Sequence, residues 1–143
     1  MFPARVLLAA DGSPDSDLAR ERVLDLVGHS GATLDVVHVG LLSPWTNPRT
    51  MSRGQLDRLR TEAQAVLDAE LAALAERGVE ARGHLRMGRA VDEILRLRDE
   101  LGSDLVVLGS RGTNAFVRVL LGSDAEGIVR HAPCPVLVVR SEP

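Results

Sequence analysis

Short apolar runs alternate along this chain with longer segments in which apolar residues recur every three or four positions. Short continuous runs are typical of strands buried on both faces, and the longer spacing is typical of amphipathic helices. From the N-terminus, the pattern predicts a strand first and then helix and strand in alternation. The predicted strands span residues 5–10, 33–39, 79–86, 104–108 and 136–139.

Each predicted helix has an apolar stripe, and most have residues that favour a start or an end. Ser13, Pro14 and Asp15 supply a capping hydroxyl, a proline suited to the first turn and an acid near the positive helix end. Gly28 and Gly31 are predicted to close this helix, and residues 41–52 to form a long loop after the second strand. The apolar stripes comprise Ala19, Val23, Leu26 and Val27; Leu56, Leu59, Ala63, Leu67, Leu71 and Leu74; Ala90, Ile94, Leu97 and Leu101; and Ala125, Ile128, Val129 and Ala132. Gly78 and Gly102 are expected just beyond the second and third helices.

This alternation predicts one α/β domain over residues 1–143. Connections that contain a helix are long enough to join parallel strands, and such crossovers are right-handed. The expected result is a doubly wound, five-stranded parallel sheet with helices on both faces. The third strand is more polar than the others, so we expect it at an edge. Ligands of such folds bind beyond the carboxyl ends of the strands, which here lie at Asp11, Val39 and Gly109.

Composition narrows the classes of function. The chain has 17 basic and 20 acidic residues and a net charge of −3, which disfavours sequence-independent binding of nucleic acid. Every basic residue is Arg, so mechanisms that need a lysine are excluded. No segment approaches the roughly 20 apolar residues of a membrane span, and we expect no membrane partner. The lone Cys134 can form neither a disulfide within the chain nor a cysteine-based zinc site, and a cytoplasmic protein fits best.

Glycines in the last third of the chain have a spacing that suits an anion site. Gly109-Ser110-Arg111-Gly112 follows the fourth strand, and nine residues later Gly122-Ser123 opens a helix. Glycine lets a sugar or phosphate approach the backbone, and the first amides of a helix attract a phosphate. The same glycines would also serve as a strand terminator, a turn and a helix start. Spacing alone does not decide between these structural roles and an anion site. A triphosphate here would need amides, hydroxyls, a divalent cation, Arg111 or Arg118 to balance its charge.

This C-terminal pattern resembles the signature of the universal stress protein family. The matching parts are Gly109-x2-Gly112-x9-Gly122-Ser123 and residues 126–139, while residues 8–13 and His38-Val39 are similar to the family's first and second strand ends. The resemblance implies a flavodoxin-like, Rossmann-like domain with strand order 3-2-1-4-5 that binds ATP, with Mg²⁺. It also implies a homodimer joined through the last strand, although loops of the chain itself would also cover that apolar edge. The residues of this strand are Val136, Leu137, Val138 and Val139.

The resemblance also assigns residues to the nucleotide. Asp11, which follows Ala9 and Ala10 at the end of the first strand, would lie near the adenine or ribose, and Val39 would contact adenine. The residues expected around the ribose and phosphates are Gly109, Arg111 and Gly112, and those of the phosphate cradle are Gly122, Ser123 and Ala125. Asp124 departs from the small or apolar residue expected after Gly122-Ser123. Its carboxylate would repel a phosphate unless it points away or helps to hold Mg²⁺.

Other chemistries have less support. Without lysine there is neither a Walker loop nor a receiver phosphorylation site, and no Gly-x-Gly occurs for a dinucleotide. Ser13 and Asp15 are interpreted as a helix cap and an acidic first turn. The four histidines lack ligand spacing, and there is no Gly-x-Ser-x-Gly nucleophile elbow. We therefore expect a regulatory, ATP-binding stress-response homodimer and not an enzyme. The alternative is an ATP-independent dimer that acts through protein contacts, which Asp124 favours.

Overall fold

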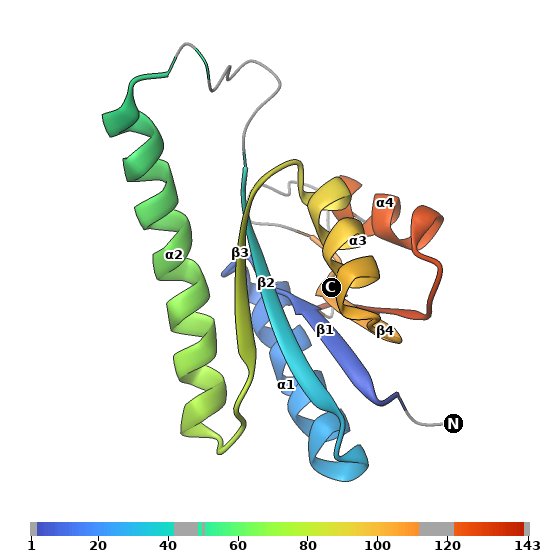
Figure 1. The fold of residues 1–143 in the computed structure, drawn as a ribbon. Coiled ribbons are helices and arrows are strands. Elements are labelled where there is room, and N and C mark those ends of the chain that lie inside the picture. Colours follow the sequence, from blue (N-terminus) through green and yellow to red (C-terminus); the bar gives the residue numbers. More distant parts are fainter. Residues whose placement is uncertain (1–2, 42–48, 50, 112–121, 142–143) are drawn as a thin grey trace.

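A computed structural model describes residues 3–41, 49, 51–111 and 122–141. At its centre is a parallel sheet with the strand order β3-β2-β1-β4-β5, which confirms the expected order (Figure 1). The strands are β1 (Arg5–Ala9), β2 (Thr33–Leu41), β3 (Arg82–Gly88), β4 (Leu105–Gly109) and β5 (Val136–Val139). In register, Val6 of β1 lies opposite Leu34 of β2 and Leu105 of β4. β1 is therefore the central strand.

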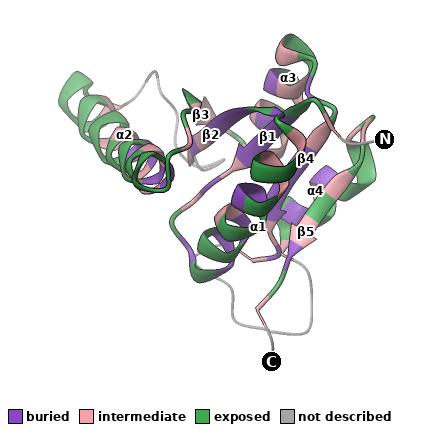
Figure 2. Cartoon of the chain, turned by 90° about the horizontal axis from the view of Figure 1, so that it is seen from below, coloured by how far each residue is buried: buried purple, intermediate pink, exposed green. Residues whose placement is uncertain are grey.

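Helices cover both faces of the sheet, as a doubly wound fold requires. They are α1 (Pro14–Ser30), α2 (Arg53–Glu76), α3 (Ala90–Leu101) and α4 (Ser123–His131). Successive strand residues alternate between the two faces, and Figure 2 shows buried positions on the central strands and on the helix sides that meet them. The face under α1 and α2 buries Val6, Leu8, Val36 and Val107 with Ala19, Val23, Leu67 and Leu74, and the face under α3 and α4 buries Leu7, Val37, Val106 and Leu108 with Ile94, Leu97 and Ile128.

Capping residues act at the helix ends as predicted. Ser13 Oγ accepts a hydrogen bond from the N–H of Ser16 at 3.1 Å, and Pro14 begins α1. Gly31 follows α1 with a φ of +70°, and Gly102 follows α3 with a φ of +69°. This left-handed conformation is strained for residues with a Cβ, so glycine is the residue expected there. Local sequence thus sets where α1 starts and where both helices end.

The prediction that the third strand begins at residue 79 is wrong. The N–H of Val79 donates to the carbonyl of Leu74 at 3.0 Å, and that of Gly78 donates to the carbonyl of Ala75 at 2.9 Å. The last carbonyls of a helix lack partners inside it, and the residues that follow often supply donors. Val79 therefore belongs to the exit from α2. β3 starts at Arg82 and, as predicted, forms an edge of the sheet.

Two other residues differ from their predicted roles. Gly28 lies inside α1, and nothing lies within 4 Å of a Cβ built on it. It therefore does not close the helix. Val129 is exposed, because the short α4 buries only its Ala125 and Ile128 side chains. The apolar stripe that spacing predicts for α4 is therefore wider than the face that this helix buries.

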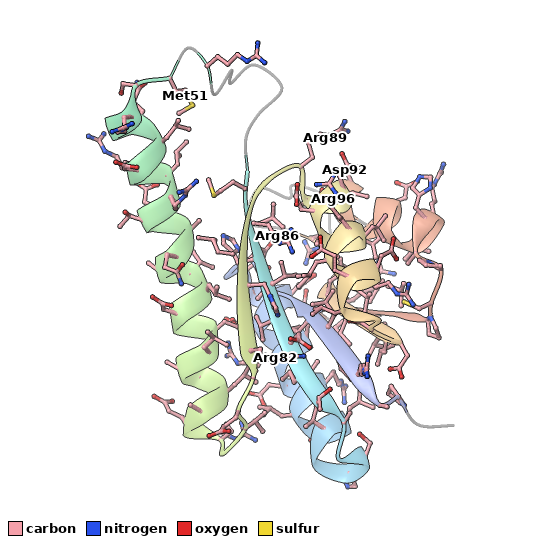
Figure 3. The ribbon with its side chains drawn as sticks, viewed as in Figure 1. Met51, Arg82, Arg86, Arg89, Asp92 and Arg96 are labelled. Carbon is pink, nitrogen blue, oxygen red and sulfur yellow. The ribbon has the colours of Figure 1, made fainter. Side chains whose placement is uncertain are left out.

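Arginines give β3 its polarity, and neighbouring acids balance them (Figure 3). Nε of Arg82 lies 3.1 Å from Oδ1 of the buried Asp35 in β2. Arg86 forms an ion pair with Glu100 of α3. Charged side chains on an edge strand discourage its pairing with another chain. This edge therefore differs from the apolar edge at β5.

Candidate functional site

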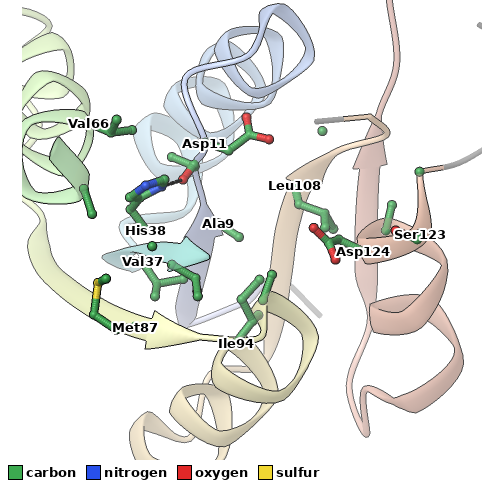
Figure 4. Close-up of a pocket in the computed structure, with 18 of the residues that line it drawn as sticks. Ala9, Asp11, Val37, His38, Val66, Met87, Ile94, Leu108, Ser123 and Asp124 are labelled. Atoms are coloured by element: carbon green, nitrogen blue, oxygen red, sulfur yellow. Dashed lines mark hydrogen bonds between the residues drawn. The ribbon is translucent and has the colours of Figure 1, made fainter. Parts of the chain in front are cut away.

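A cavity of about 590 Å³ opens at the carboxyl ends of the parallel strands (Figure 4). The ends of β1, β2 and β4 and the first turn of α4 line it, together with side chains from α2, β3 and α3. Loops at this edge diverge toward opposite faces of the sheet where the strand order reverses, which leaves room for a ligand. The cavity thus lies where the strand order predicts a binding site.

Most of the residues assigned from the resemblance line this cavity. They are Ala9, Ala10, Asp11, Val39, Gly109, Gly122, Ser123, Asp124 and Ala125. Arg111 is described but does not contribute to the lining. Gly112 and Arg118 lie outside the described residues. The fold therefore brings the two ends of the motif, after β4 and at the start of α4, to the same cavity as the end of β1.

Apolar walls of the cavity were not predicted from the sequence. Leu59, Ala63 and Val66 of α2 contribute to them, as do Met87 of β3 and Ile94 of α3. Apolar helix residues that line a cavity recur with the same period as those that pack on a sheet. Spacing alone therefore cannot distinguish cavity walls from the hydrophobic core. Figure 4 shows Val66, Met87 and Ile94 around the opening. Such walls suit a flat, largely apolar ring.

Backbone hydrogen bonds fix two polar side chains in the lining. Oδ1 of Asp11 accepts from the N–H of Ser13 at 2.9 Å. Nδ1 of His38 lies 2.7 Å from the carbonyl oxygen of Ala10, and because a carbonyl oxygen only accepts, Nδ1–H is the donor. His38 was not assigned to the site. The one feature of the sequence that points to it is its position next to Val39 at the end of the second strand.

Gly109 has a packing role that its motif does not indicate. A Cβ built on it would lie 2.7 Å from the carbonyl carbon of Asp15 and 2.8 Å from the nitrogen of Ser16. Side chains cannot approach backbone atoms so closely without a shift of one element. The first turn of α1 therefore packs directly on the end of β4. Contact between Gly109 and a ribose stays a prediction.

Asp15, Ser110, Arg111 and Ser141 form a polar cluster that we call the clasp. Ser110 Oγ donates to Oδ2 of Asp15 at 2.6 Å, and Nη2 of Arg111 donates to Oγ of Ser141 at 2.9 Å. Nε of Arg111 lies 3.5 Å from Oδ2 of Asp15, an ion pair without a hydrogen bond. The clasp thereby joins α1, the end of β4 and the residue that follows Arg140. It also explains why Arg111 does not line the cavity.

Asp15 is ionised in the clasp although it is only 3% exposed. Burial by itself would raise the pKa of this carboxyl. Hydrogen bonds from Ser110 and Ser141 and the charge of Arg111 outweigh that effect and lower the pKa. The interpretation of Asp15 as an acidic first-turn residue was therefore incomplete, because the side chain is a buried centre of the cluster.

The first turn of α4, which lines the cavity, begins with amides that have no partner within the helix. The first bond within this helix runs from the N–H of Glu126 to the carbonyl of Gly122 at 2.9 Å. The amides of Ser123, Asp124 and Ala125 precede it and have no partner inside the helix, and no side chain caps it. Such amides, at the positive end of the helix dipole, favour an anionic group. The start of α4 can therefore hold a phosphate.

Apart from His38, the ionisable side chains that line the cavity in the described part of the chain are acids. They are Asp11, Glu62 and Asp124. Burial, and after it the charge of Asp11, raises the pKa of Asp124. No three His, Cys, Asp or Glu side chains among the described residues are placed to hold a metal ion together. A divalent cation here would need oxygens from a ligand as well.

Comparison with known proteins agrees with the resemblance seen in the motifs. The model of the universal stress protein family matches residues 4–140. A Staphylococcus haemolyticus protein named as a universal stress protein is 31% identical over 140 residues, which are 96% of this chain and 84% of its own. A solved universal stress protein family member from Burkholderia pseudomallei is 30% identical with a TM-score of 0.72 over 96% of both chains. A family member from Arabidopsis thaliana, solved with AMP bound, has a TM-score of 0.70 and 22% identity over 98% of this chain and 93% of its own.

Proposed function

Because this chain belongs to the universal stress protein family, we propose that it binds ATP, together with Mg²⁺, in the cavity described above. The observation behind the proposal is that apolar walls and the first turn of α4, whose amides lack partners within the helix, meet at one edge of the sheet. The walls suit an adenine ring and the amides suit a phosphate. The Arabidopsis thaliana protein supports the proposal, since it combines the same fold with a bound adenine nucleotide.

In this proposal the assigned residues divide between the base, the sugar and the phosphates. Val39 contacts the adenine near Ala9 and Ala10, and Asp11 lies beside the ribose. The phosphate cradle consists of Gly122, Ser123 and Ala125. Gly109, Arg111 and Gly112 border the ribose and phosphates through the segment between β4 and α4. Because the clasp holds the guanidinium of Arg111, this residue acts by fixing the base of that segment.

Mg²⁺ has a clear electrostatic purpose in such a complex. The acids that line the cavity oppose the negative charge of a triphosphate, and a bound divalent cation neutralises part of that charge. Asp11 and Asp124 are the carboxylates that would share the ion with phosphate oxygens. The chain's own contribution is to hold the phosphate at the amides of α4.

We further propose that the protein is a regulatory homodimer and not an enzyme. Among the strands that the structure describes, β5 pairs only with β4, and Leu137 of β5 is 37% exposed. An apolar edge strand of this kind can be covered by the same strand of a second copy. The clasp connects Ser110, which lines the cavity, with Ser141 just beyond β5. Nucleotide occupancy therefore has a physical route to the dimer surface.

A second candidate function and the location stay predictions. An ATP-independent dimer that acts by protein contact is favoured by the acids in the cavity. No helix of the described segments is long and apolar enough to cross a membrane. The expectation of a cytoplasmic protein rests on the lone Cys134.

Calorimetric titration with ATP and Mg²⁺, after bound ligand has been stripped from the protein, tests the nucleotide proposal. We expect saturable binding close to one nucleotide per chain. Val66→Trp would fill the cavity from α2 and should weaken binding by about tenfold or more, because the overlap with the base must be relieved.

Ala65→Trp is the matched control, since it adds the same indole to an exposed position next to Val66 on α2. It should bind ATP as the wild type does. Equal affinity in both variants would place the nucleotide outside this cavity. An absence of binding to the wild type, in calorimetry and in thermal-shift assays, would favour the ATP-independent dimer.

A further inference from the structure

Asp124 places a negative charge inside the proposed phosphate cradle. It is the second residue of α4, between Ser123 and Ala125, and all three line the cavity. The sequence does not determine whether its carboxylate points toward a bound phosphate or away from it. Figure 4 shows the side chain beside that of Leu108, on the cavity side of α4. A phosphate at the α4 amides would therefore lie next to this carboxylate.

No described cation balances Asp124. The chain contains no lysine, and Arg111, which the sequence suggested as a phosphate partner, is engaged in the clasp. Nη2 of Arg130, on the same helix as Asp124, lies 2.8 Å from Oε1 of Glu126. The residue that shares the cavity with Asp124 and interacts with its charge is another acid, Asp11. Negatively charged side chains therefore lie on both sides of the cavity.

Water now reduces the effect of this charge, because Asp124 is still exposed to solvent within the cavity. A nucleotide that fills the cavity would displace that water. Repulsion between like charges grows as the effective dielectric constant falls. The repulsion between Asp124 and each negative charge that a ligand brings to the α4 amides therefore increases once the ligand has displaced the water.

We infer that Asp124 is a specificity-determining residue that makes the cavity select adenine ligands by their phosphate charge. The inference rests on the nucleotide-binding function proposed above. Asp124 weakens the binding of metal-free ATP most, that of AMP less and that of adenosine least. Mg²⁺ relieves part of the penalty for ATP, because it neutralises phosphate charge before the nucleotide meets the carboxylate.

Titrations of adenosine, AMP and ATP in the presence of EDTA test this inference. Asp124→Asn keeps the size of the side chain and removes its charge. We expect the variant to bind metal-free ATP about tenfold more tightly than the wild type does. The gain for AMP should be smaller and that for adenosine close to none, so that the ratio of ATP affinity to AMP affinity rises.

Glu126→Gln is the matched control, because it removes a charge from the same helix turn at a residue that does not line the cavity. It should leave the ratio of ATP to AMP affinity unchanged. The same ratio in Asp124→Asn and wild type would overturn the inference and leave nucleotide binding intact. An equal rise in Glu126→Gln would also overturn it, since the helix end would then be the cause. Failure of all three ligands to bind wild type and Asp124→Asn would overturn the proposed function and the inference with it.

Discussion

Asp15 lies in the first turn of α1, yet its partners Ser110 and Arg111 follow β4 and Ser141 follows β5. A buried carboxylate remains ionised only where hydrogen bonds and positive charge replace its lost hydration. The clasp provides both. Because Ser110 also lines the cavity, Asp15 positions one wall of the site without touching the ligand space itself.

Asp15→Asn should lower the free energy of unfolding by about 2 kcal/mol at neutral pH, because it takes the charge partner from Arg111 and weakens the bond from Ser110. The effect should depend on pH. The pKa of Asp15 is lower in the folded protein than in the unfolded chain, where it is about 3.9. Its ionisation therefore stabilises the fold above that value and ceases to do so as the pH falls through the folded pKa.

Urea unfolding of wild type and Asp15→Asn between neutral and acid pH measures this difference, which should shrink in acid. Asp17→Asn is the control, since the carboxylate of this acid in the same helix turn is exposed and pairs with Arg20 at the surface. It should change stability little. A difference between Asp15→Asn and wild type that is constant with pH would contradict an ionised clasp.

At the residue scale, sequence predicts what depends on near neighbours. Asp11, Gly122 and Ser123 could be assigned because they end a strand or open a helix next to recognisable motifs. Asp15 could not be recognised as a buried centre, because Ser110 lies 95 residues further along the chain. Asp124 was noticed in the sequence as a departure, and the structure supplied its direction toward the cavity.

At Gly109 the end of β4 packs directly against the backbone of α1. Gly109→Ala should destabilise the fold by about 1–3 kcal/mol, because its methyl group would lie under 3 Å from the backbone of Asp15 and Ser16. Thermal and urea unfolding would measure the change.

Gly28→Ala makes the same chemical change where a helix has open space around it. It should stabilise the protein by up to about 1 kcal/mol, because alanine favours a helix interior. Opposite signs for the two substitutions would support the packing at Gly109. An alanine at Gly109 as stable as wild type would mean that α1 and β4 lie farther apart.

At the element scale, periodicity predicted the kinds and order of the elements, since burial on one or both faces imposes the apolar pattern. It failed where hydrogen bonds between elements or at their ends decide the boundary. Val79 is apolar and suits a strand, yet its N–H completes the end of α2. The apolar stripe of α2 likewise serves two purposes, since Leu67 and Leu74 pack on the sheet while Leu59 and Ala63 line the cavity.

The whole molecule has two unlike sheet edges, with balanced charges along β3 and an apolar strand at β5. Strand order could be expected from the alternation of elements together with the family resemblance. The dimer was expected from the resemblance and stays a prediction. If β5 is the interface, Leu137→Arg should shift the protein toward monomer in sedimentation velocity at micromolar concentration, because it introduces a charge on an apolar surface that pairing would bury.

Leu18→Arg is the control for Leu137→Arg, since Leu18 is an equally exposed leucine on α1, 41% exposed. It should leave the sedimentation coefficient unchanged. A dimer that persists in Leu137→Arg would move the interface away from β5. A wild-type protein that sediments as a monomer would contradict the proposed dimer.

The clasp also has a consequence for how the protein is made. A ribosome releases β1 and α1 early, but β4, the second neighbour of β1, emerges only after α3, and Ser141, the last member of the clasp, emerges only after β5. Until then the carboxylate of Asp15 has none of the partners that allow its burial. Residues of β1 and α1 should therefore remain unfolded, and accessible to chaperones and proteases, until β4 and Ser141 have been synthesised. Chaperones and proteases consequently have access to this domain for most of the time that it takes to synthesise it.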